Sequence, residues 1–143
     1  MGGIDRVVID TNVWVSGVLK PAGPPGQILR LLEAHAIEAV VTEALAAELV
    51  DVLGREHLRR RFVIDDVDLA LLLAVLDQVV VEIRLDPPLR DPNDLPVIEA
   101  AVIGKARTII SGDLDLVGDP TILRWLSDRG IEVLTPTAFL AAR

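Results

Sequence analysis

Short runs of β-branched residues alternate along this chain with longer segments of helical periodicity. The expected strands are residues 7–9, 39–41, 79–81, 108–110 and 132–134, and the expected helices are residues 26–35, 43–55, 66–77, 95–105 and 120–129. The strand candidates lack polar alternation, as strands covered on both faces should. The pattern therefore predicts an α/β fold, a three-layer α/β/α arrangement around a mainly parallel central sheet of four to five strands.

The length and the residue types bound the fold further. A chain of 143 residues without a linker, repeat or low-complexity tract is expected to form one domain over residues 1–143. Cysteine is absent, which excludes a disulfide framework, an iron–sulfur site, a zinc knuckle and a thiol nucleophile. The two histidines, His35 and His57, cannot make a zinc site, and we expect both at the surface.

The charge and hydropathy of the chain limit its partners and its location. Asp and Glu number 22 against 14 Lys and Arg, for a net charge of −8, which disfavours purely electrostatic binding to nucleic acid. The longest nearly apolar stretch, residues 69–83, contains Asp77, Gln78 and Glu82 and cannot span a bilayer. The amino terminus lacks the cationic and apolar regions of a secretory signal, so we expect a cytoplasmic protein.

Four acidic residues are expected to meet at one edge of the sheet. Asp10 follows the first strand and Asp113 follows the fourth, and the carboxyl ends of strands are where open α/β folds bind ligands. Glu48 lies on the flank of the apolar stripe of the helix at 43–55. Asp94 falls near the middle of the apolar arc of the helix at 95–105 when that helix is extended backward. These four acids are the expected catalytic and metal-binding residues.

Each acid taken alone also has a simpler interpretation. Asp10 starts an Asx turn, Glu48 borders a solvated face, Asp94 caps its own helix, and Asp113 or Asp115 lies in a solvated turn. The convergence of four acids from four elements favours a site over four separate coincidences. Asp91, further from the helix, is a less favoured ligand.

Carboxylates so arranged repel one another and raise one another's pKa values unless a cation lies among them. Oxygen ligands without His or Cys favour Mg²⁺ or Mn²⁺ with several waters retained. Sites of this kind typically hydrolyse phosphate esters, because the metal activates water and stabilises the leaving oxygen. Asp115 stands two residues after Asp113 and offers the same ligand.

Short motifs follow one another in order along nearly the whole chain. They are Asp10-Thr11-Asn12 after a strand, Thr42-Glu43 at the start of the helix with Glu48, Arg90-Asp91-Pro92-x-Asp94, Ser111-Gly112-Asp113 and Thr135-Pro136-Thr137-x-Phe139. This ordered set resembles the PIN-domain nucleases. It is especially similar to the PIN proteins that act as toxins in bacterial toxin–antitoxin pairs, the VapC-like group.

The resemblance implies a metal-dependent endoribonuclease. The acids matching Asp10, Glu48, Asp94 and Asp113 bind Mg²⁺ or Mn²⁺ in such proteins and cleave single-stranded or structured RNA. The positions matching Asn12 and Ser111 support that site, and Thr11 lies between the strand acid and Asn12. Ser111 stands where Thr is commoner and keeps the hydroxyl group.

The basic residues and the high content of hydrophobic residues indicate which molecules the protein binds. Arg55, Arg59, Arg60 and Arg61 form a basic cluster, which is expected either to follow an RNA backbone or to be a solvated loop. Hydrophobic residues make up 51% of the chain, so we expect apolar surface and a twofold homodimer. The resemblance adds a cognate antitoxin that covers the acidic cleft.

Two other functions remain open from the sequence. A phosphate-accepting receiver domain has an adjacent acidic pair after its first strand and a lysine after its fifth. Here Asp10 has no acidic neighbour, and the lysines are Lys20 and Lys105. A catalytically silent interaction domain is the third interpretation, and intact acids argue against it.

Overall fold

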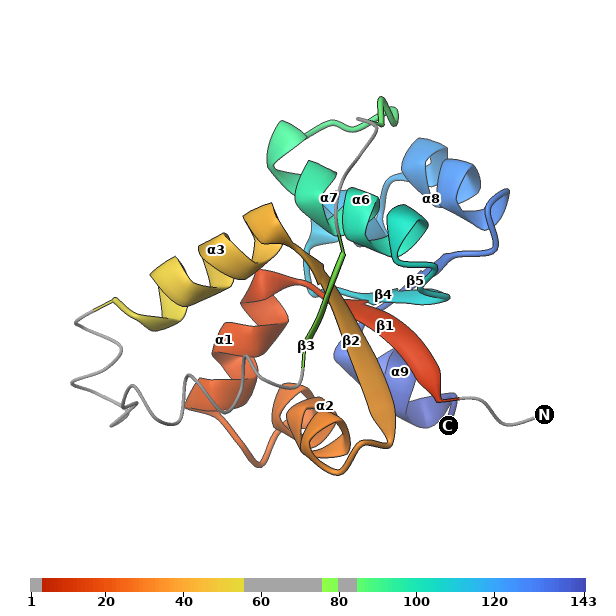
Figure 1. Ribbon diagram of the computed structural model, residues 1–143. Helices are drawn as coiled ribbons and strands as arrows, with labels where there is room; N and C mark the ends of the chain where they lie inside the picture. The colour runs from red at the N-terminus through yellow and green to blue at the C-terminus, as the bar shows by residue number, and fades with distance from the viewer. Residues whose placement is uncertain (1–3, 56–75, 80–84) are drawn as a thin grey trace.

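The computed structural model describes residues 4–55, 76–79 and 85–143, with only the backbone of residues 79, 114 and 115 (Figure 1). The elements are β1 (Asp5–Ile9), α1 (Thr11–Leu19), α2 (Pro24–Glu33), β2 (Ile37–Thr42), α3 (Glu43–Leu53), β3 (Leu76–Val79), the 3₁₀ turn η1 (Pro92–Asp94), α6 (Leu95–Ile103), β4 (Thr108–Ile110), α7 (Leu114–Val117), α8 (Pro120–Ser127), β5 (Glu132–Leu134) and α9 (Pro136–Ala141). No helix in these ranges has both the length and the apolar character needed to cross a membrane.

The five strands form one parallel sheet in the order β3-β2-β1-β4-β5, which confirms the predicted sheet. The chain moves from β1 outward to β2 and β3, then crosses back to place β4 on the other side of β1. The order of strands therefore reverses between β1 and β4. In open α/β sheets, such a reversal opens a crevice beyond the carboxyl ends of the two strands.

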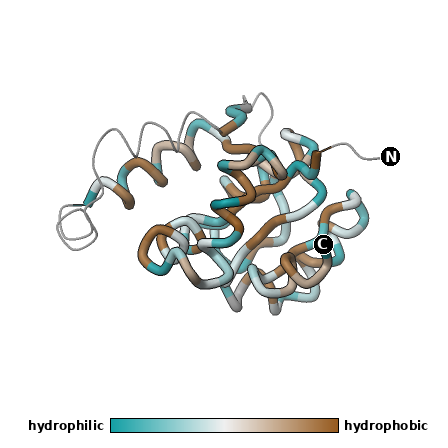
Figure 2. The backbone as a smooth tube through the Cα atoms, turned by 90° about the horizontal axis from the view of Figure 1, so that it is seen from below, coloured by the Kyte–Doolittle hydropathy of each residue, from teal (hydrophilic) through white to brown (hydrophobic). Residues whose placement is uncertain are grey.

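Two apolar cores lie on the two faces of the sheet, which gives the predicted three layers. One core packs α6, α7 and α8 against the sheet, and the other packs α1, α2 and α9 against its opposite face. Neighbouring residues of β1 serve different cores, with Val7 and Ile9 in the second and Val8 in the first. Figure 2 shows apolar residues dominating the segments in the middle of the molecule. Burial on both faces explains why these strands lack polar alternation.

Helix α3 connects the two cores at the sheet's edge. Its buried leucines divide between them, with Leu45 in the first core and Leu49 and Leu53 in the second. The helix starts as the sequence predicts, because the Thr42 hydroxyl oxygen accepts a hydrogen bond from the Leu45 N–H at 3.1 Å. This placement turns one side of α3 toward the carboxyl ends of the strands.

Several predicted boundaries are wrong by a few residues. The helices expected to run through residues 35, 55, 105 and 129 end earlier, at Glu33, Leu53, Ile103 and Ser127. Two of them stop at a glycine cap, Gly54 or Gly104. The α2 helix is followed by His35, which has a left-handed φ of 58° and is exposed as expected.

The largest error of assignment concerns the third strand. It begins at Leu76, three residues before the predicted start, so Leu76 and Asp77 are not helical. Parallel pairing with β2 extends the strand backward, through Ala39↔Leu76 and Val40↔Asp77. The rest of the helix predicted at 66–77 lies outside the described residues. The short helices α1, α7 and α9 are additions to the predicted elements.

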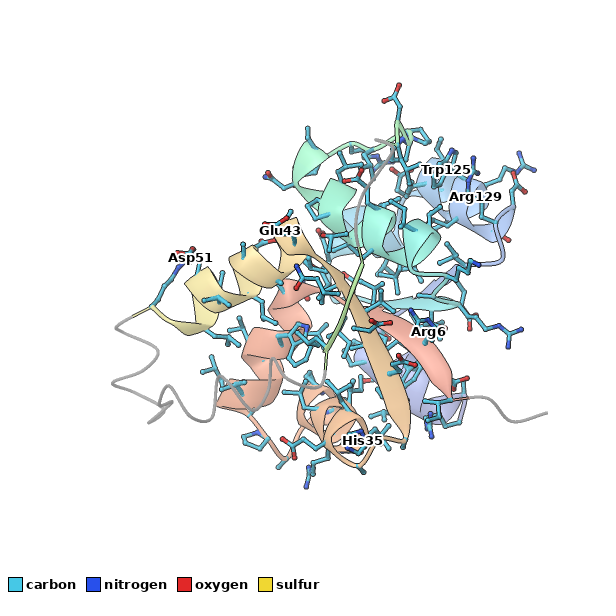
Figure 3. The ribbon with its side chains drawn as sticks, viewed as in Figure 1. Arg6, His35, Glu43, Asp51, Trp125 and Arg129 are labelled. Carbon is cyan, nitrogen blue, oxygen red and sulfur yellow. The ribbon has the colours of Figure 1, made fainter. Side chains whose placement is uncertain are left out.

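Arg6 of β1 ties the amino ends of several elements together. Its guanidinium donates to the Gly104 carbonyl at 3.0 Å, to Glu38 at 2.9 Å and to Asp77 at 3.0 Å. The side chain is 30% exposed and is labelled beside β1 in Figure 3. The interactions join β1 to β2, to β3 and to the turn before β4.

We predict that Arg6→Met lowers the free energy of unfolding by about 1.5–3 kcal/mol, the usual range for hydrogen bonds to charged groups. Denaturant titration of the purified protein measures this change. Arg107→Met, an exposed arginine at the start of β4, is the control and is expected to stay within about 0.5 kcal/mol of wild type. Equal losses in the two variants would contradict the assigned role of Arg6.

Candidate active site

A cleft of about 500 Å³ opens where the strand order reverses between β1 and β4. Its lining residues come from the β1–α1 junction, α3, the η1 turn and the loop after β4: Asp10, Thr11, Asn12, Val15, Ser16, Glu48, Val52, Asp91, Asn93, Asp94 and Asp113. Carboxylate oxygens of Asp10, Asp94 and Asp113 all lie within 4.8 Å of one another. The structure therefore brings three of the four predicted acids into one cluster.

Asp10 is delivered by the end of β1 and the start of α1. Its Oδ1 accepts a hydrogen bond from the Thr11 N–H at 2.8 Å, and its Oδ2 accepts one from the Ser111 hydroxyl at 2.7 Å. Its own N–H donates to the Ile110 carbonyl at 2.9 Å and continues the pairing with β4. Asp10 thus caps α1 and also reaches the cluster.

Ser111 connects the two acids that follow the paired strands. Its buried hydroxyl donates to Asp10 and accepts from the Asp113 N–H at 3.0 Å. One hydroxyl therefore orients a carboxylate of one loop and the backbone of the other. Asn12 adds a weaker link, because its Oδ1 accepts from the Gly112 N–H at 3.5 Å. Both residues thus link the β1–α1 junction to the loop after β4.

Asp94 stands where η1 passes into α6 and is largely buried. Its side chain makes no capping hydrogen bond to α6, so the interpretation of Asp94 as a simple cap is wrong. Asp91 is the residue that caps η1, because its Oδ1 accepts from the Asn93 N–H at 2.9 Å. Asp91 lines the cleft but lies outside the three-acid cluster.

Glu48 reaches the cleft from α3 and also lies outside the cluster. Partial burial and the negative charge of Asp10 raise the pKa of Glu48 above its ordinary value, and Arg55 opposes this shift. The Thr11 hydroxyl also lowers this pKa. This buried hydroxyl makes no hydrogen bond of ordinary geometry with the described residues.

The environment of Asp10 disfavours its charged form. Burial raises the pKa of Asp10 above its ordinary value of 3.8, the hydrogen bonds from Ser111 and Thr11 lower it, and the negative charge of Asp113 raises it again. The net direction is upward. In the absence of a cation, the cluster therefore holds its negative charge at a cost in free energy.

Other predicted residues lie outside the three-acid cluster or outside the described part of the chain. The side chain of Asp115 and the residues His57, Arg59, Arg60 and Arg61 lie outside the described part of the chain. Arg55 is exposed at the end of α3 and pairs with Asp51 at 3.5 Å; Asp51 is labelled on this helix in Figure 3.

Three cleft residues carried by α1 and η1, Val15, Ser16 and Asn93, were missed by reasoning from the sequence. The β-branched residues of Thr11–Leu19 are weak helix formers and hide α1 from a propensity argument. The available signal is Asp10 itself, since aspartate is a good helix cap.

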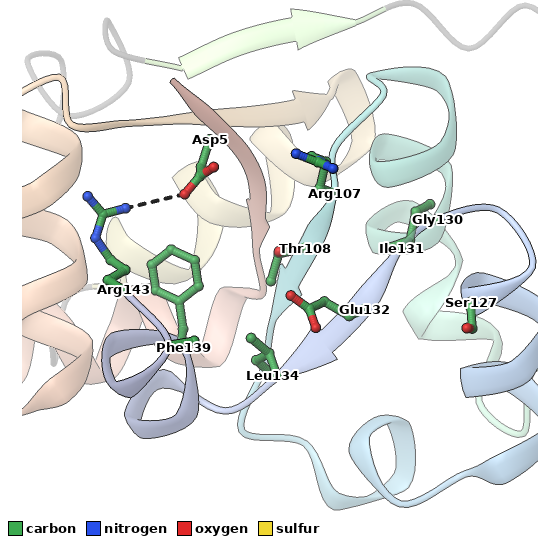
Figure 4. A pocket seen from close by; sticks show the side chains of 11 residues that line it. Asp5, Arg107, Thr108, Ser127, Gly130, Ile131, Glu132, Leu134, Phe139 and Arg143 are labelled. Carbon is green, nitrogen blue, oxygen red and sulfur yellow. Dashed lines mark hydrogen bonds and ion pairs between the residues drawn. The ribbon is translucent and has the colours of Figure 1, made fainter. Parts of the chain in front are cut away.

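A second cavity of about 360 Å³ lies at the opposite edge of the sheet, between the amino ends of β1, β4 and β5 and helix α9 (Figure 4). Its charged side chains are of both signs, Arg107 and Arg143 with Asp5 and Glu132, and Arg143 pairs with Asp5 at 3.4 Å. Because ligands of open α/β sheets bind at the carboxyl edge, we place the functional site in the acidic cleft.

Comparison with known proteins identifies the family of the chain. The sequence profile of the PIN domain matches residues 6–115, a range that includes Asp10, Glu48, Asp94 and Asp113. The chain belongs to the PIN domain family. PIN domains are generally nucleases, that is, hydrolases that use divalent metals.

This PIN domain is also similar to two individual proteins. An uncharacterized protein of Methanocaldococcus jannaschii is 29% identical over 138 residues, covering 92% of this chain and 86% of that protein. A chain from the crystal structure of VapBC2 from Rickettsia felis, bound to a DNA fragment from their promoter, superposes with a TM-score of 0.59 and 16% identity. That match covers 91% of this chain and 98% of the other and shows a shared fold.

The raised pKa of Asp10 predicts a pH-dependent cost to the metal-free protein. A carboxyl whose pKa is higher in the folded state stabilises the fold below its unfolded pKa, and this contribution is lost as pH rises through the folded pKa. Asp10→Asn should therefore gain stability relative to wild type as pH rises from about 3.8 toward neutrality. Denaturant unfolding in a chelator, at a series of pH values, measures the difference.

The control for this experiment is Asp86→Asn, an exposed acid outside the cleft. Its unfolding free energy should follow the wild-type pH curve. A gain for Asp10→Asn that does not change with pH would contradict the assigned electrostatic cost.

Proposed function

We propose that this PIN domain is a Mg²⁺- or Mn²⁺-dependent endoribonuclease and the toxin of a toxin–antitoxin pair. The observation that carries the proposal is the meeting of Asp10, Asp94 and Asp113 within 4.8 Å at the reversal of strand order. The family match supports nuclease chemistry, and the fold shared with a chain of VapBC2 supports the toxin assignment. The choice of RNA as substrate rests on the resemblance described from the sequence.

The chemistry of the cleft fits a hard divalent cation. Its donor set consists of carboxylates without His or Cys, the ligands that Mg²⁺ and Mn²⁺ prefer. A positive charge at the cluster would favour the charged form of Asp10, whose pKa is raised mainly by burial and further by the negative charge of Asp113. The buried Thr11 hydroxyl, without a partner in the described structure, offers a further polar group to a retained water. Bound there, the cation would activate water and stabilise the leaving oxygen of the phosphodiester.

The chain's own residues have distinct roles in this proposal. Asp10, Asp94 and Asp113 hold the cation, while the Ser111 hydroxyl keeps Asp10 and the Asp113 loop in register. Glu48, across the cleft on α3, is a further ligand or the group that accepts a proton from water, and its raised pKa suits proton transfer. Asp91 and Asp115 are additional candidate ligands.

The acidic cleft must still attract a polyanion. A bound divalent cation would reverse the local sign of charge, and basic residues would add contacts to the RNA backbone. We assign this role to Arg55, which is close enough to Glu48 to lower its pKa, and to the arginines that follow it in the chain, Arg59, Arg60 and Arg61. In this proposal the RNA enters beside Arg55, at the carboxyl end of α3.

The proposed partners are a cognate antitoxin and a second copy of the chain. An antitoxin that places an Arg or Lys among the acids would compete with the cation for the cleft. Large exposed apolar side chains are few in the described part of the chain, Ile4 and Val50, and they give little support to the homodimer. A cytoplasmic location follows from the proposed RNA substrate.

A receiver-like phosphoacceptor fits the geometry less well. Asp10 is followed by Thr11 and Asn12, so no adjacent acidic pair stands at the end of β1. Lys105 follows α6 and precedes β4, at the amino edge of the sheet and away from the cleft. The segment after β5 starts with Thr135 and Pro136 and supplies no lysine.

We predict that Mg²⁺ or Mn²⁺ raises the thermal stability of wild type, by about 2.7 kcal/mol at roughly 100 times its Kd. Asp94→Asn should fold, lose this stabilisation and lose cleavage of a labelled single-stranded RNA. Thermal scans with metal and with chelator, together with cleavage assays, test both effects. Asp86→Asn is the matched control. Full activity of Asp94→Asn, or equal unfolding temperatures of wild type with metal and with chelator, would overturn the site assignment.

Replacing Arg59, Arg60 and Arg61 together with alanine should weaken RNA binding and leave metal affinity unchanged. The dependence of binding on salt should become shallower, by roughly 0.7 in the logarithmic slope for each phosphate that the variant no longer neutralises. The control removes the same charge from exposed positions away from the cleft, Lys105, Arg107 and Arg124. Cleavage equal to wild type at every salt concentration would identify the cluster as a solvated loop.

A further inference from the structure

Trp14 of α1 contacts the backbone immediately before Asp10. Its side chain is 1% exposed, and its indole N–H donates to the Ile9 carbonyl at 3.1 Å. This carbonyl belongs to the peptide group whose N–H is that of Asp10. The N–H of the same peptide donates to the Ile110 carbonyl of β4 at 2.9 Å. The peptide that leads into Asp10 is therefore held at both of its polar ends.

The sheet alone supplies only one of these two restraints. Pairing of β1 with β4 continues to Ile9↔Ile110, whereas the paired stretch of β1 and β2 ends at Val7↔Ala39. Beyond that point, the donor for the Ile9 carbonyl is a side chain four residues beyond Asp10, on α1. A buried carbonyl without a donor is energetically costly, so the indole N–H strongly favours this one peptide orientation.

We propose that Trp14 is a positioning residue that fixes the Asp10 carboxylate for cation binding, acting through the Ile9–Asp10 peptide. The inference rests on the proposed metal site. The orientation of this peptide sets the direction of the Asp10 side chain, whose Oδ2 must meet Ser111 and the carboxylates of Asp94 and Asp113. A small rotation of the peptide would move this carboxylate out of the cluster.

Trp14 is also part of the apolar core formed with α2 and α9. A role in packing alone predicts that loss of the indole N–H lowers stability and leaves cation affinity unchanged. A positioning role predicts a loss of cation affinity that stability does not explain. It also predicts that kcat of RNA cleavage falls more than KM rises, because the RNA contacts are elsewhere. These two outcomes separate the roles.

The experiment compares two tryptophan-to-phenylalanine substitutions in the full chain. Trp14→Phe keeps an aromatic ring in the core and removes the donor. Trp125→Phe is the matched control, because Trp125 lies on α8, on the other face of the sheet, with Arg129 stacked over its ring at 3.5 Å (Figure 3). Calorimetric titration with Mn²⁺ alone should show about 10- to 100-fold weaker binding for Trp14→Phe, the usual effect of removing a group that orients a ligand. Trp125→Phe should bind as wild type does.

A second variant covers the case in which Trp14→Phe does not fold. The chain has two tryptophans, so in the Trp125→Phe background a tryptophan analogue labels position 14 alone. Benzothienylalanine has nearly the shape of tryptophan, with sulfur in place of the N–H. It should reproduce the loss of Mn²⁺ affinity at nearly unchanged volume.

The outcomes separate the inference from the function on which it rests. Absence of Mn²⁺ binding to the wild-type protein would overturn the metal site, and the role of Trp14 with it. Normal binding by wild type and equal binding by the position-14 variants would overturn the role of Trp14 alone. Weaker binding by the position-14 variants, with an unchanged Trp125→Phe control, supports the proposal.

Discussion

Parallel pairing of β1 with β4 is the constraint on which the cleft depends. This pairing continues to the last residue of each strand, so the next residues, Asp10 and Ser111, leave the sheet side by side. The hydrogen bond between their side chains, 2.7 Å long, then fixes the spacing of the two loops. Because β2 stops pairing with β1 two residues earlier, the same point is also where the sheet opens.

The remaining elements bring further acids to this opening. The cap at Thr42 starts α3 directly at the end of β2 and directs Glu48 to the cleft wall. The turn η1, capped by Asp91, leads Asp94 to the other side at the start of α6. Each of these local features is an ordinary helix cap or turn. The order of the strands brings the acids that they carry to the same edge of the sheet.

Much of this arrangement could be predicted from sequence because it follows local rules. Strands that end in an acid, the Thr42 cap and the apolar arc of α6 are all readable without long-range information. The distances among carboxylates are not readable, and Glu48 shows the limit, since it reaches the cleft but not the cluster. The start of β3 was misplaced for a related reason, because Leu76 and Asp77 become strand only through pairing with β2 and a hydrogen bond from Arg6.

Two aspartates cap helices in the same way but differ in the charge of their partners. Asp119 and Asp10 both cap a helix, α8 and α1 respectively. Asp119 is buried and has Arg90 at 3.5 Å, so its charge is balanced within the protein. Asp10 instead receives its hydrogen bonds from a hydroxyl and a backbone N–H, and these neutral donors orient it without cancelling its charge. A cationic partner for Asp10 would lower its pKa, but it would occupy the place that a bound cation needs. The choice of a neutral partner therefore leaves both the orientation and the negative charge of Asp10 available for a ligand.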